Sequence, residues 1–341
     1  MSGPDARILE EPGVSTADFR EDADLAEYGD RRDGKFYRYT PDIKLAVRVA
    51  LAVNRPLLVF GPSGCGKSSL VFNLARLLRR RYYEFVVNSR SEAADLYYRF
   101  DAVRRLGEAQ LGAAGTEEGR ALWRDSHNFI DPGPLWWVYS PETARNRGVA
   151  EANGSVREAI DSGRWPDDYA DSPARILPAN QQVPSAILLI DEIDKADPDF
   201  PNNLLVPLGS RQFIVEETGD LIRLDRERTQ TDSPLIVITS NRERELPTAF
   251  VRRCVVLEIR SLTNDELVDL ARSTFRNAGD TEPETWRRVA EILQRIRGSN
   301  PVSPAEFLDC INAIRLLRAD QSEWEEVILR TSWTSAAVDR D

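Results

Sequence analysis

The sequence predicts an α/β fold: a parallel five-stranded sheet flanked by helices, followed by a C-terminal α-helical domain. The first observation is that five apolar stretches, rich in β-branched and aromatic residues, alternate with helical patterns. The second is a glycine-rich loop, residues 61–66, that joins the first of these strands to a helix. The third is that the chain beyond Thr263 contains only helical spacing and helix-start signals.

The bulk composition is that of a globular protein. With 341 residues, the chain is long enough for about two or three domains. Hydrophobic residues make up 41% and charged residues 30%, which allows a sizeable buried core. The net charge of −11 argues against a surface devoted to nucleic acid. No apolar stretch approaches the roughly 20 residues that span a bilayer, so no membrane association is expected.

Cysteine and histidine are scarce. The three cysteines, Cys65, Cys254 and Cys310, are widely spaced and odd in number, which indicates a reducing compartment and no disulfide framework. The N-terminus lacks the basic-then-apolar order of a signal peptide, and we expect a cytoplasmic protein. The single histidine, His127, does not favour a histidine-based metal or catalytic site, and we expect it at the surface of an irregular segment.

The glycine-rich loop has the form of a phosphate-binding loop (P-loop). It follows the apolar stretch 56–60 and precedes the helical pattern 69–78, which is the context that such a loop requires. Its glycines let several N–H groups point at one anion, and the following helix adds its positive end. Lys67 is expected to reach the β- and γ-phosphates of a nucleotide, and Ser68 to offer a hydroxyl to Mg²⁺. The residues assigned to nucleotide binding are Gly61, Pro62, Ser63, Gly64, Cys65, Gly66, Lys67, Ser68 and Ser69.

Two adjacent acids follow a strand that the pattern buries on both faces, residues 186–190. Asp191 is expected to hold Mg²⁺ together with Ser68, and Glu192 to orient or deprotonate an attacking water. A further buried strand, 235–239, ends near Asn241, whose neutral side chain is expected to contact the γ-phosphate or its water. Ligands of open α/β sheets bind at the carboxyl ends of strands, where these residues would lie.

The N-terminal part of the chain changes character near residue 36. Residues 1–35 are acidic and predict a flexible tail, with docking on a partner as the alternative. Thr40 and Pro41 then have the form of an N-cap and first helical residue. Tyr37 and Tyr39 fit either stacking near an adenine or aromatic packing at a domain edge, and the sequence leaves both open.

A long insertion separates the second strand, 82–87, from the strand before Asp191. Such a connection must contain structure of its own, and we expect a helical insertion over about 89–185 with one helix at 93–110. Its aromatic segment, 133–139, favours a local core over a substrate contact.

The remaining elements follow from alternation and capping signals. The capping-box spacing begins at Thr263, Thr281, Ser303 and Ser322 and predicts four C-terminal helices. The other expectations are a helix at 200–208, a hairpin at 211–224 turning at Gly219–Asp220, a short helix at 246–253 and a fifth strand at 254–259.

This order of motifs resembles an AAA+ ATPase, and within that superfamily the MoxR branch. The resemblance covers residues about 40–320 and rests on the stretches 61–69, 188–196, 211–214, 238–243 and 246–254. It implies an α/β nucleotide-binding core at 36–262 and a helical lid at 263–341. It also implies that Asn241 is the sensor-1 residue and that Arg253, with Arg252 as the alternate, is the arginine finger. A sensor-2 arginine is absent from Ser303–Glu306, which leaves Arg315 or another residue to replace it.

The resemblance implies ATP hydrolysis with Mg²⁺ at the subunit interfaces of a homo-oligomeric ring, most often a hexamer. The implied role is chaperone-like remodelling of a partner protein, such as one with a von Willebrand A-type domain. The alternative is a nucleic-acid-directed AAA+ motor of a defence or restriction-type system. A third reading, a nucleotide-gated scaffold with negligible turnover, is opposed by Glu192.

Overall fold

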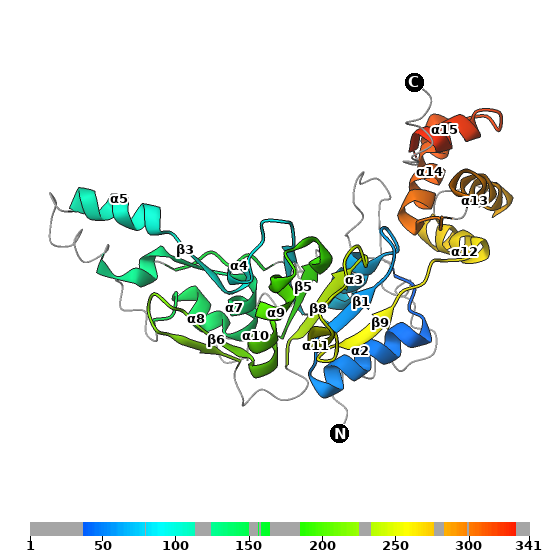
Figure 1. The fold of residues 1–341 in the computed structure, drawn as a ribbon. Coiled ribbons are helices and arrows are strands. Elements are labelled where there is room, and N and C mark those ends of the chain that lie inside the picture. Colours follow the sequence, from blue (N-terminus) through cyan, green and yellow to red (C-terminus); the bar gives the residue numbers. More distant parts are fainter. Residues whose placement is uncertain are drawn as a thin grey trace.

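A computed structural model describes residues 37–78, 80–112, 124–149, 156, 158–163, 185–224, 233–275, 283–298 and 300–331. Figure 1 shows a central sheet with the insertion extending from one side and the C-terminal helices from the other. The acidic stretch 1–35 and residues 164–184 at the end of the predicted insertion lie outside the described residues.

The described residues form the predicted parallel five-stranded sheet. Its strands lie in the order β2-β5-β8-β1-β9, and every neighbouring pair is parallel. The two strands that precede the predicted acid pair and Asn241 are buried at every position, because both faces of the sheet are covered. The strands are β1 (Leu57–Phe60), β2 (Arg81–Val86), β5 (Ala186–Asp191), β8 (Leu235–Ser240) and β9 (Val255–Glu258).

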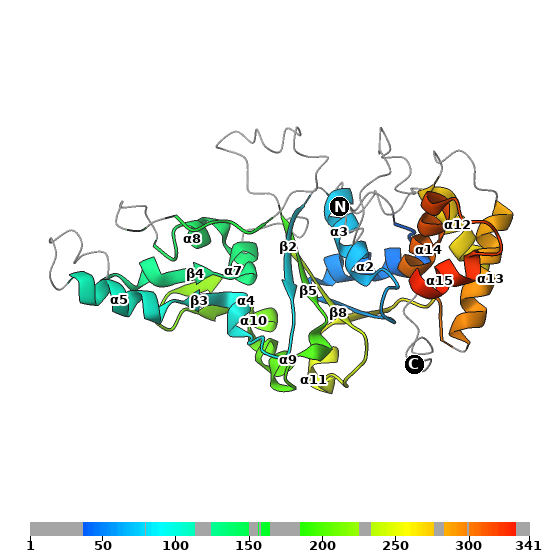
Figure 2. The same ribbon diagram turned by 90° about the horizontal axis from the view of Figure 1, so that it is seen from above.

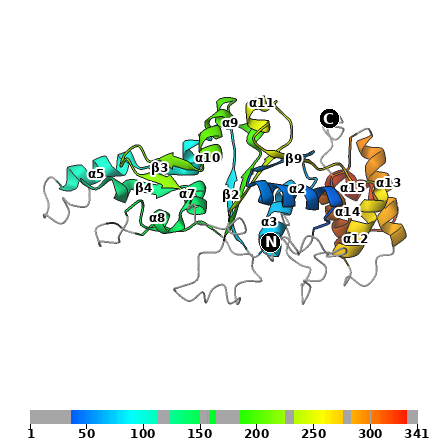
Figure 3. The ribbon, with the colours of Figure 1, turned by 90° about the horizontal axis from the view of Figure 1, so that it is seen from below.

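Helices lie on opposite sides of this sheet, which is seen nearly edge-on in Figure 2 and from the other side in Figure 3. Leu57 and Val59 point into a core shared with α2 (Pro41–Val53) and α3 (Lys67–Leu77). The alternate residues of β1 point into a second core, shared with α7 (Pro134–Tyr139), α9 (Asp199–Asn203) and α11 (Thr248–Val251). The predicted start of α2 is confirmed, since the N–H of Ile43 donates to Thr40 Oγ1 over 3.3 Å.

The insertion is not wholly helical, and the prediction of one helix at 93–110 is wrong. Residues Tyr98–Phe100 form β3, which pairs antiparallel with β4 at Ile130–Pro132. Apolar spacings of three and one resemble a helix locally, but this pairing with a distant segment extends the backbone. Among the described residues of this part, the helical elements are α4 (Ala94–Tyr97), α5 (Ala102–Gly112), the 3₁₀ segment η2 (Ser126–Phe129), α7 and α8 (Pro141–Arg145).

The predicted hairpin is present and completes the core of the insertion. Its strands β6 (Gln212–Ile214) and β7 (Leu221–Arg223) place Phe213 opposite Ile222. The Phe213 ring lies 5.1 Å from the ring of Tyr97 and 6.0 Å from that of Trp136, measured between centroids. Trp136 and its neighbours in α7 are buried, so this aromatic segment is a core, as the sequence favoured.

Trp136→Ala is expected to lower the free energy of unfolding by about 3–5 kcal/mol, the usual cost of removing a buried aromatic side chain. The side chain is fully buried, and its Nε1 donates to Thr143 Oγ1 over 3.0 Å. Denaturant unfolding measures the change, with Val103→Ala as the control because Val103 is 83% exposed. Equal losses for the two variants would contradict the assignment of this segment to the core.

The single histidine does not lie at the surface of an irregular segment, as the sequence had suggested. His127 is half-buried in η2, with Nδ1 2.6 Å from Asp125 Oδ1 and Nε2 2.9 Å from Asp220 Oδ2. Burial by itself lowers the pKa of the imidazole. The carboxylates of Asp125 and Asp220 together raise this pKa by more than burial lowers it, so the net shift is upward. His127 therefore links the insertion to the β6–β7 hairpin.

The C-terminal region is helical, as predicted, and packs around a core of its own. The capping box at Thr263 is complete, whereas Ser303 accepts the N–H of Glu306 while the Glu306 carboxylate binds Arg297. Thr281 lies outside the described residues. The helices are α12 (Asn264–Thr274), α13 (Pro283–Arg297), α14 (Pro304–Leu317) and α15 (Trp324–Thr331). In the part of the chain that the structure describes, no helix has the length and apolarity needed to cross a membrane.

The region 200–208 and the short helix before β9 differ from the sequence expectation in length. The first forms two helices, α9 and α10 (Leu205–Ser210), which meet at Leu204. The second, α11, begins only at Thr248 because Pro247 occupies its N-cap position.

Candidate functional site

The predicted P-loop connects β1 to α3 at the carboxyl edge of the sheet. Its backbone takes the left-handed conformation at Gly64, where φ is +73°, and at Gly66, where φ is +93°. A Cβ atom at Gly66 would lie 3.3 Å from the Tyr37 ring, so the loop turns tightly against that side chain. Gly66 is also the N-cap of α3, whose positive end therefore faces the loop.

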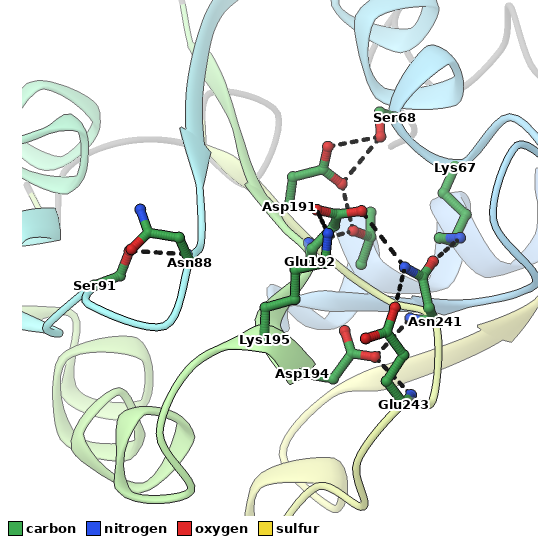
Figure 4. A network of polar contacts seen from close by, with 11 residues as sticks. Lys67, Ser68, Asn88, Ser91, Asp191, Glu192, Asp194, Lys195, Asn241 and Glu243 are labelled. Atoms are coloured by element: carbon green, nitrogen blue, oxygen red, sulfur yellow. Dashed lines mark hydrogen bonds and ion pairs between the residues drawn. The ribbon is translucent and has the colours of Figure 1, made fainter.

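Lys67 is folded into this loop rather than extended into solvent. Its side chain is buried, and Nζ donates to Gly61 O over 2.8 Å and to Pro62 O over 2.9 Å. The third acceptor is Asn241 Oδ1, 2.6 Å away at the end of β8 (Figure 4). The ammonium group is thus held where a phosphate in the loop would meet it.

Ser68 and Asp191 approach each other across the edge of the sheet. Ser68 Oγ is 3.0 Å from Asp191 Oδ1 and 2.8 Å from Oδ2, and Thr239 also donates to the same carboxylate. A hydroxyl and a carboxylate are the oxygen donors that suit Mg²⁺. Among the described residues no group of three or more His, Cys, Asp or Glu could hold a metal ion.

Glu192 has a left-handed backbone, with φ of 60°, which is unusual for a residue other than glycine. Its N–H donates to Thr239 Oγ1 over 2.9 Å. Its carboxylate binds Lys195 Nζ over 2.7 Å and lies 3.5 Å from Asn241 Nδ2 (Figure 4). The bond to Glu192 raises the pKa of the Lys195 ammonium, which stays charged at neutral pH. The contact with Asn241 places the Glu192 carboxylate next to the end of β8.

Five predicted residues from three parts of the chain therefore lie together: Lys67, Ser68, Asp191, Glu192 and Asn241. The sequence analysis missed four others that contact them. Each follows or lies within a predicted motif, but nothing local distinguished it from an ordinary polar neighbour. These residues are Thr239, Asp194, Lys195 and Glu243.

The two candidate finger arginines lie elsewhere. Arg252 and Arg253 are exposed just beyond α11, and Arg253 Nη1 donates to Ala249 O over 3.3 Å. Within one chain the structure joins neither side chain to the residues around Lys67, and an arginine that acts on a neighbouring subunit need not be so joined.

Arg315, one candidate to replace the sensor-2 arginine, lies within the helical region. Its guanidinium is 5.3 Å from the centre of the Phe275 ring and donates to Asn312 Oδ1. Ser303, at the start of α14, contacts the P-loop, since its Oγ is 3.2 Å from Gly64 O. Ser303, and not Arg315, is therefore the residue of this pair that lies next to the P-loop.

Tyr37 and Tyr39 pack behind the loop. Their rings meet edge to face with centroids 5.4 Å apart, and Tyr39 Oη donates to Asn73 Oδ1 over 2.7 Å. Burial raises the pKa of the Tyr39 hydroxyl well above its usual range. These contacts favour aromatic packing against α3 for Tyr39, while Tyr37 borders Gly66.

Comparison with solved structures returns RuvB proteins of low overall likeness. A RuvB mutant from Thermotoga maritima shares 15% identity with a TM-score of 0.40, covering 85% of this chain and 67% of that one. Thermotoga maritima RuvB, described as a Holliday junction branch migration motor, shares 14% identity with a TM-score of 0.35, covering 84% and 65%. No curated protein matches the sequence.

A family model gives the decisive match. The model described as AAA domain (dynein-related subfamily) aligns with residues 56–254, which is more than half of the 341 residues. The matched range runs from β1 to the residue before β9 and includes the P-loop, the acid pair and Asn241. The chain therefore belongs to the AAA domain family, within its dynein-related subfamily.

Proposed function

We propose that this protein is a Mg²⁺-dependent ATPase of the AAA+ class that works as a homo-oligomeric ring. The observation that carries the proposal is the convergence of Lys67, Ser68, Asp191, Glu192 and Asn241 at one edge of the sheet. A buried ammonium, an oxygen pair suited to Mg²⁺ and a carboxylate beside an amide are the groups that phosphoryl transfer to water requires.

Nucleotide binding would use the loop and its lysine. The N–H groups of residues 61–66 and the start of α3 would surround the phosphates, and Lys67 would exchange its carbonyl partners for phosphate oxygens. Ser68 and Asp191 would hold Mg²⁺, which supplies charge neutralisation between the phosphates when bound. The Ser68–Asp191 hydrogen bond already holds both ligands at one place.

Hydrolysis would depend on Glu192 and Asn241. Glu192 would accept a proton from the attacking water, and Asn241 would hold that water or the γ-phosphate through its amide. The amide already lies between Lys67 and Glu192, so it connects the phosphate end of the site to the base. Arg253, with Arg252 as the alternate, would reach the γ-phosphate of a neighbouring subunit.

The finer assignment follows the motif resemblance. We place the protein in the MoxR branch, with a core at 36–262, a lid at 263–341 and a hexameric ring in the cytoplasm. Its substrate would be a partner protein that it remodels, such as one with a von Willebrand A-type domain. The nucleic-acid motor is the weaker candidate, because the net charge of −11 argues against a surface devoted to nucleic acid.

Glu192→Gln tests the proposal most directly. The variant is expected to bind ATP and Mg²⁺ but to hydrolyse ATP at least ~10²-fold more slowly, because an amide cannot act as the base. Steady-state phosphate release measures turnover, and calorimetry measures ATP affinity. Glu216→Gln serves as the control, since Glu216 is exposed on the hairpin turn. Unchanged turnover in the Glu192 variant would show that another group activates the water.

A further inference from the structure

The loop that follows β8 is attached to the turn that follows β5 by one buried carboxylate. Asp194 is only 2% exposed, and its Oδ2 accepts the N–H of Asn241 over 3.0 Å and the N–H of Glu243 over 2.8 Å (Figure 4). It lies in the 3₁₀ segment η5 (Ile193–Lys195), two residues after Glu192. The carboxylate therefore connects the candidate base to the candidate sensor through a short and rigid path.

We propose that Asp194 is a positioning residue that holds Asn241 in place beside Glu192 and so sets the geometry of hydrolysis. This inference rests on the proposed ATPase function. Asp194 does not itself reach substrate in this role; its effect passes through the main chain of Asn241 and Glu243.

Backbone conformation supports this role. Glu192 and Arg242 both have left-handed backbones, with φ of 60° and 61°, which cost energy for residues other than glycine. Such conformations persist only where surrounding contacts hold them. Asp194 follows the first strained residue closely, and its two N–H partners flank the second. One side chain thus joins the turn at Glu192 to the turn at Arg242.

Further bonds join the same two segments on either side of Asp194. Thr239 Oγ1 accepts the N–H of Glu192 over 2.9 Å, and Arg244 Nη1 donates to Ala196 O over 3.0 Å. Asp194 lies between these two bonds, and it is the residue that accepts the backbone N–H of Asn241. Loss of Asp194 would leave the outer bonds in place and free the part that carries the sensor, which predicts an effect on catalysis without unfolding.

The charge of Asp194 matters as well as its shape. Hydrogen bonds to an ionised acceptor are about twice as strong as neutral ones. Asp194 Oδ1 has no hydrogen-bond partner among the described residues, so the recorded bonds of this carboxylate are those made by Oδ2. Asp194→Asn would keep an oxygen for the two N–H groups but hold them less firmly, which makes it a graded probe beside Asp194→Ala.

The test compares Asp194→Ala and Asp194→Asn with the parent chain, and repeats both substitutions in an Asn241→Ala background. Asp194→Ala is expected to lower kcat about 10²-fold, the scale of a 1 Å misplacement, with the Kd for ATP within about threefold of the parent. The kcat of Asp194→Asn is expected to be about tenfold higher than that of Asp194→Ala, and so still about tenfold below that of the parent chain. In the Asn241→Ala background, Asp194→Ala should cost less than about threefold, because residues that act through each other are not additive.

Amide hydrogen exchange gives a readout that does not depend on turnover. The amides of Asn241 and Glu243 should exchange faster in Asp194→Ala than in the parent, while those of β5 and β8 keep the parent rates. If the parent chain shows no turnover, the proposed function is wrong, and exchange alone then decides whether Asp194 orders the loop. Unchanged exchange at Asn241 and Glu243, additive effects of the two substitutions, or a Kd that weakens in step with kcat would overturn the inference.

Discussion

Lys67→Ala is expected to lose nucleotide binding, with the Kd for ATP weakened at least ~10²-fold, since charge-assisted hydrogen bonds contribute about 1.5–3 kcal/mol each. Lys67 is the lysine of the P-loop, and its Nζ lies among oxygen acceptors inside that loop. Removing the ammonium leaves a bound triphosphate without its main protein counter-charge. Titration calorimetry with ATP and Mg²⁺ measures the effect.

Lys44→Ala is the matched control for this measurement. Lys44 carries the same charge but belongs to α2 and not to the P-loop, so its loss should leave the Kd unchanged. Thermal unfolding of both variants separates loss of binding from loss of fold. Equal ATP affinity for Lys67→Ala and the parent would show that the loop at residues 61–68 is not the phosphate site.

Arg253→Ala is expected to bind ATP with near-parental affinity but to hydrolyse it about 10³–10⁵-fold more slowly, the contribution of an arginine finger in other nucleotide hydrolases. The site residues of one chain do not include Arg253, whose exposed side chain lies beyond α11. Its removal should therefore leave the nucleotide pocket of its own subunit intact. The loss would fall on the transition state in the adjoining subunit.

Mixing two inactive variants tests the shared site. In a mixed ring, an intact P-loop on an Arg253→Ala subunit can face an intact arginine on a Lys67→Ala subunit. We expect ATPase activity to return on mixing and to pass through a maximum as the mixing ratio varies. The assay is run at protein concentrations where the ring assembles, because dilution separates subunits from their fingers.

The neighbouring arginine provides the control for this experiment. Full activity in Arg253→Ala together with an inactive Arg252→Ala would move the assignment to Arg252. If both single variants keep parental turnover, or if turnover per subunit stays constant on dilution to the monomer, the shared-site mechanism is wrong for this protein.

The strands, the P-loop and the acid pair were predictable because their signals are local. A parallel strand covered on both faces must be apolar at successive positions, as residues 186–190 are. A loop that turns around phosphate needs glycine where φ is positive, as at Gly64 and Gly66. Position at the carboxyl ends of strands then brought Lys67, Asp191 and Asn241 to one edge.

Local periodicity misled the prediction where a distant segment decided the conformation. Residues 98–100 have apolar spacing that fits a helix, yet they pair with β4 about thirty residues later. His127 was expected at the surface of an irregular segment, yet its Nδ1 lies 2.6 Å from Asp125 Oδ1. Its second partner, Asp220, comes from the hairpin and is brought close only by folding of the insertion.

The sequence by itself determined which residue types the candidate site contains, since the residue types and spacings of the P-loop and the acid pair are properties of short stretches. Only the tertiary structure decided how the site is held together. It placed β5 beside β8. Because these strands are neighbours, the Asp194 carboxylate can accept the backbone N–H of Asn241, and Thr239 Oγ1 can accept the backbone N–H of Glu192. It likewise set Ser303 against Gly64. These contacts join residues more than 40 positions apart, and the strand order that creates them follows from packing of the whole sheet rather than from any local pattern.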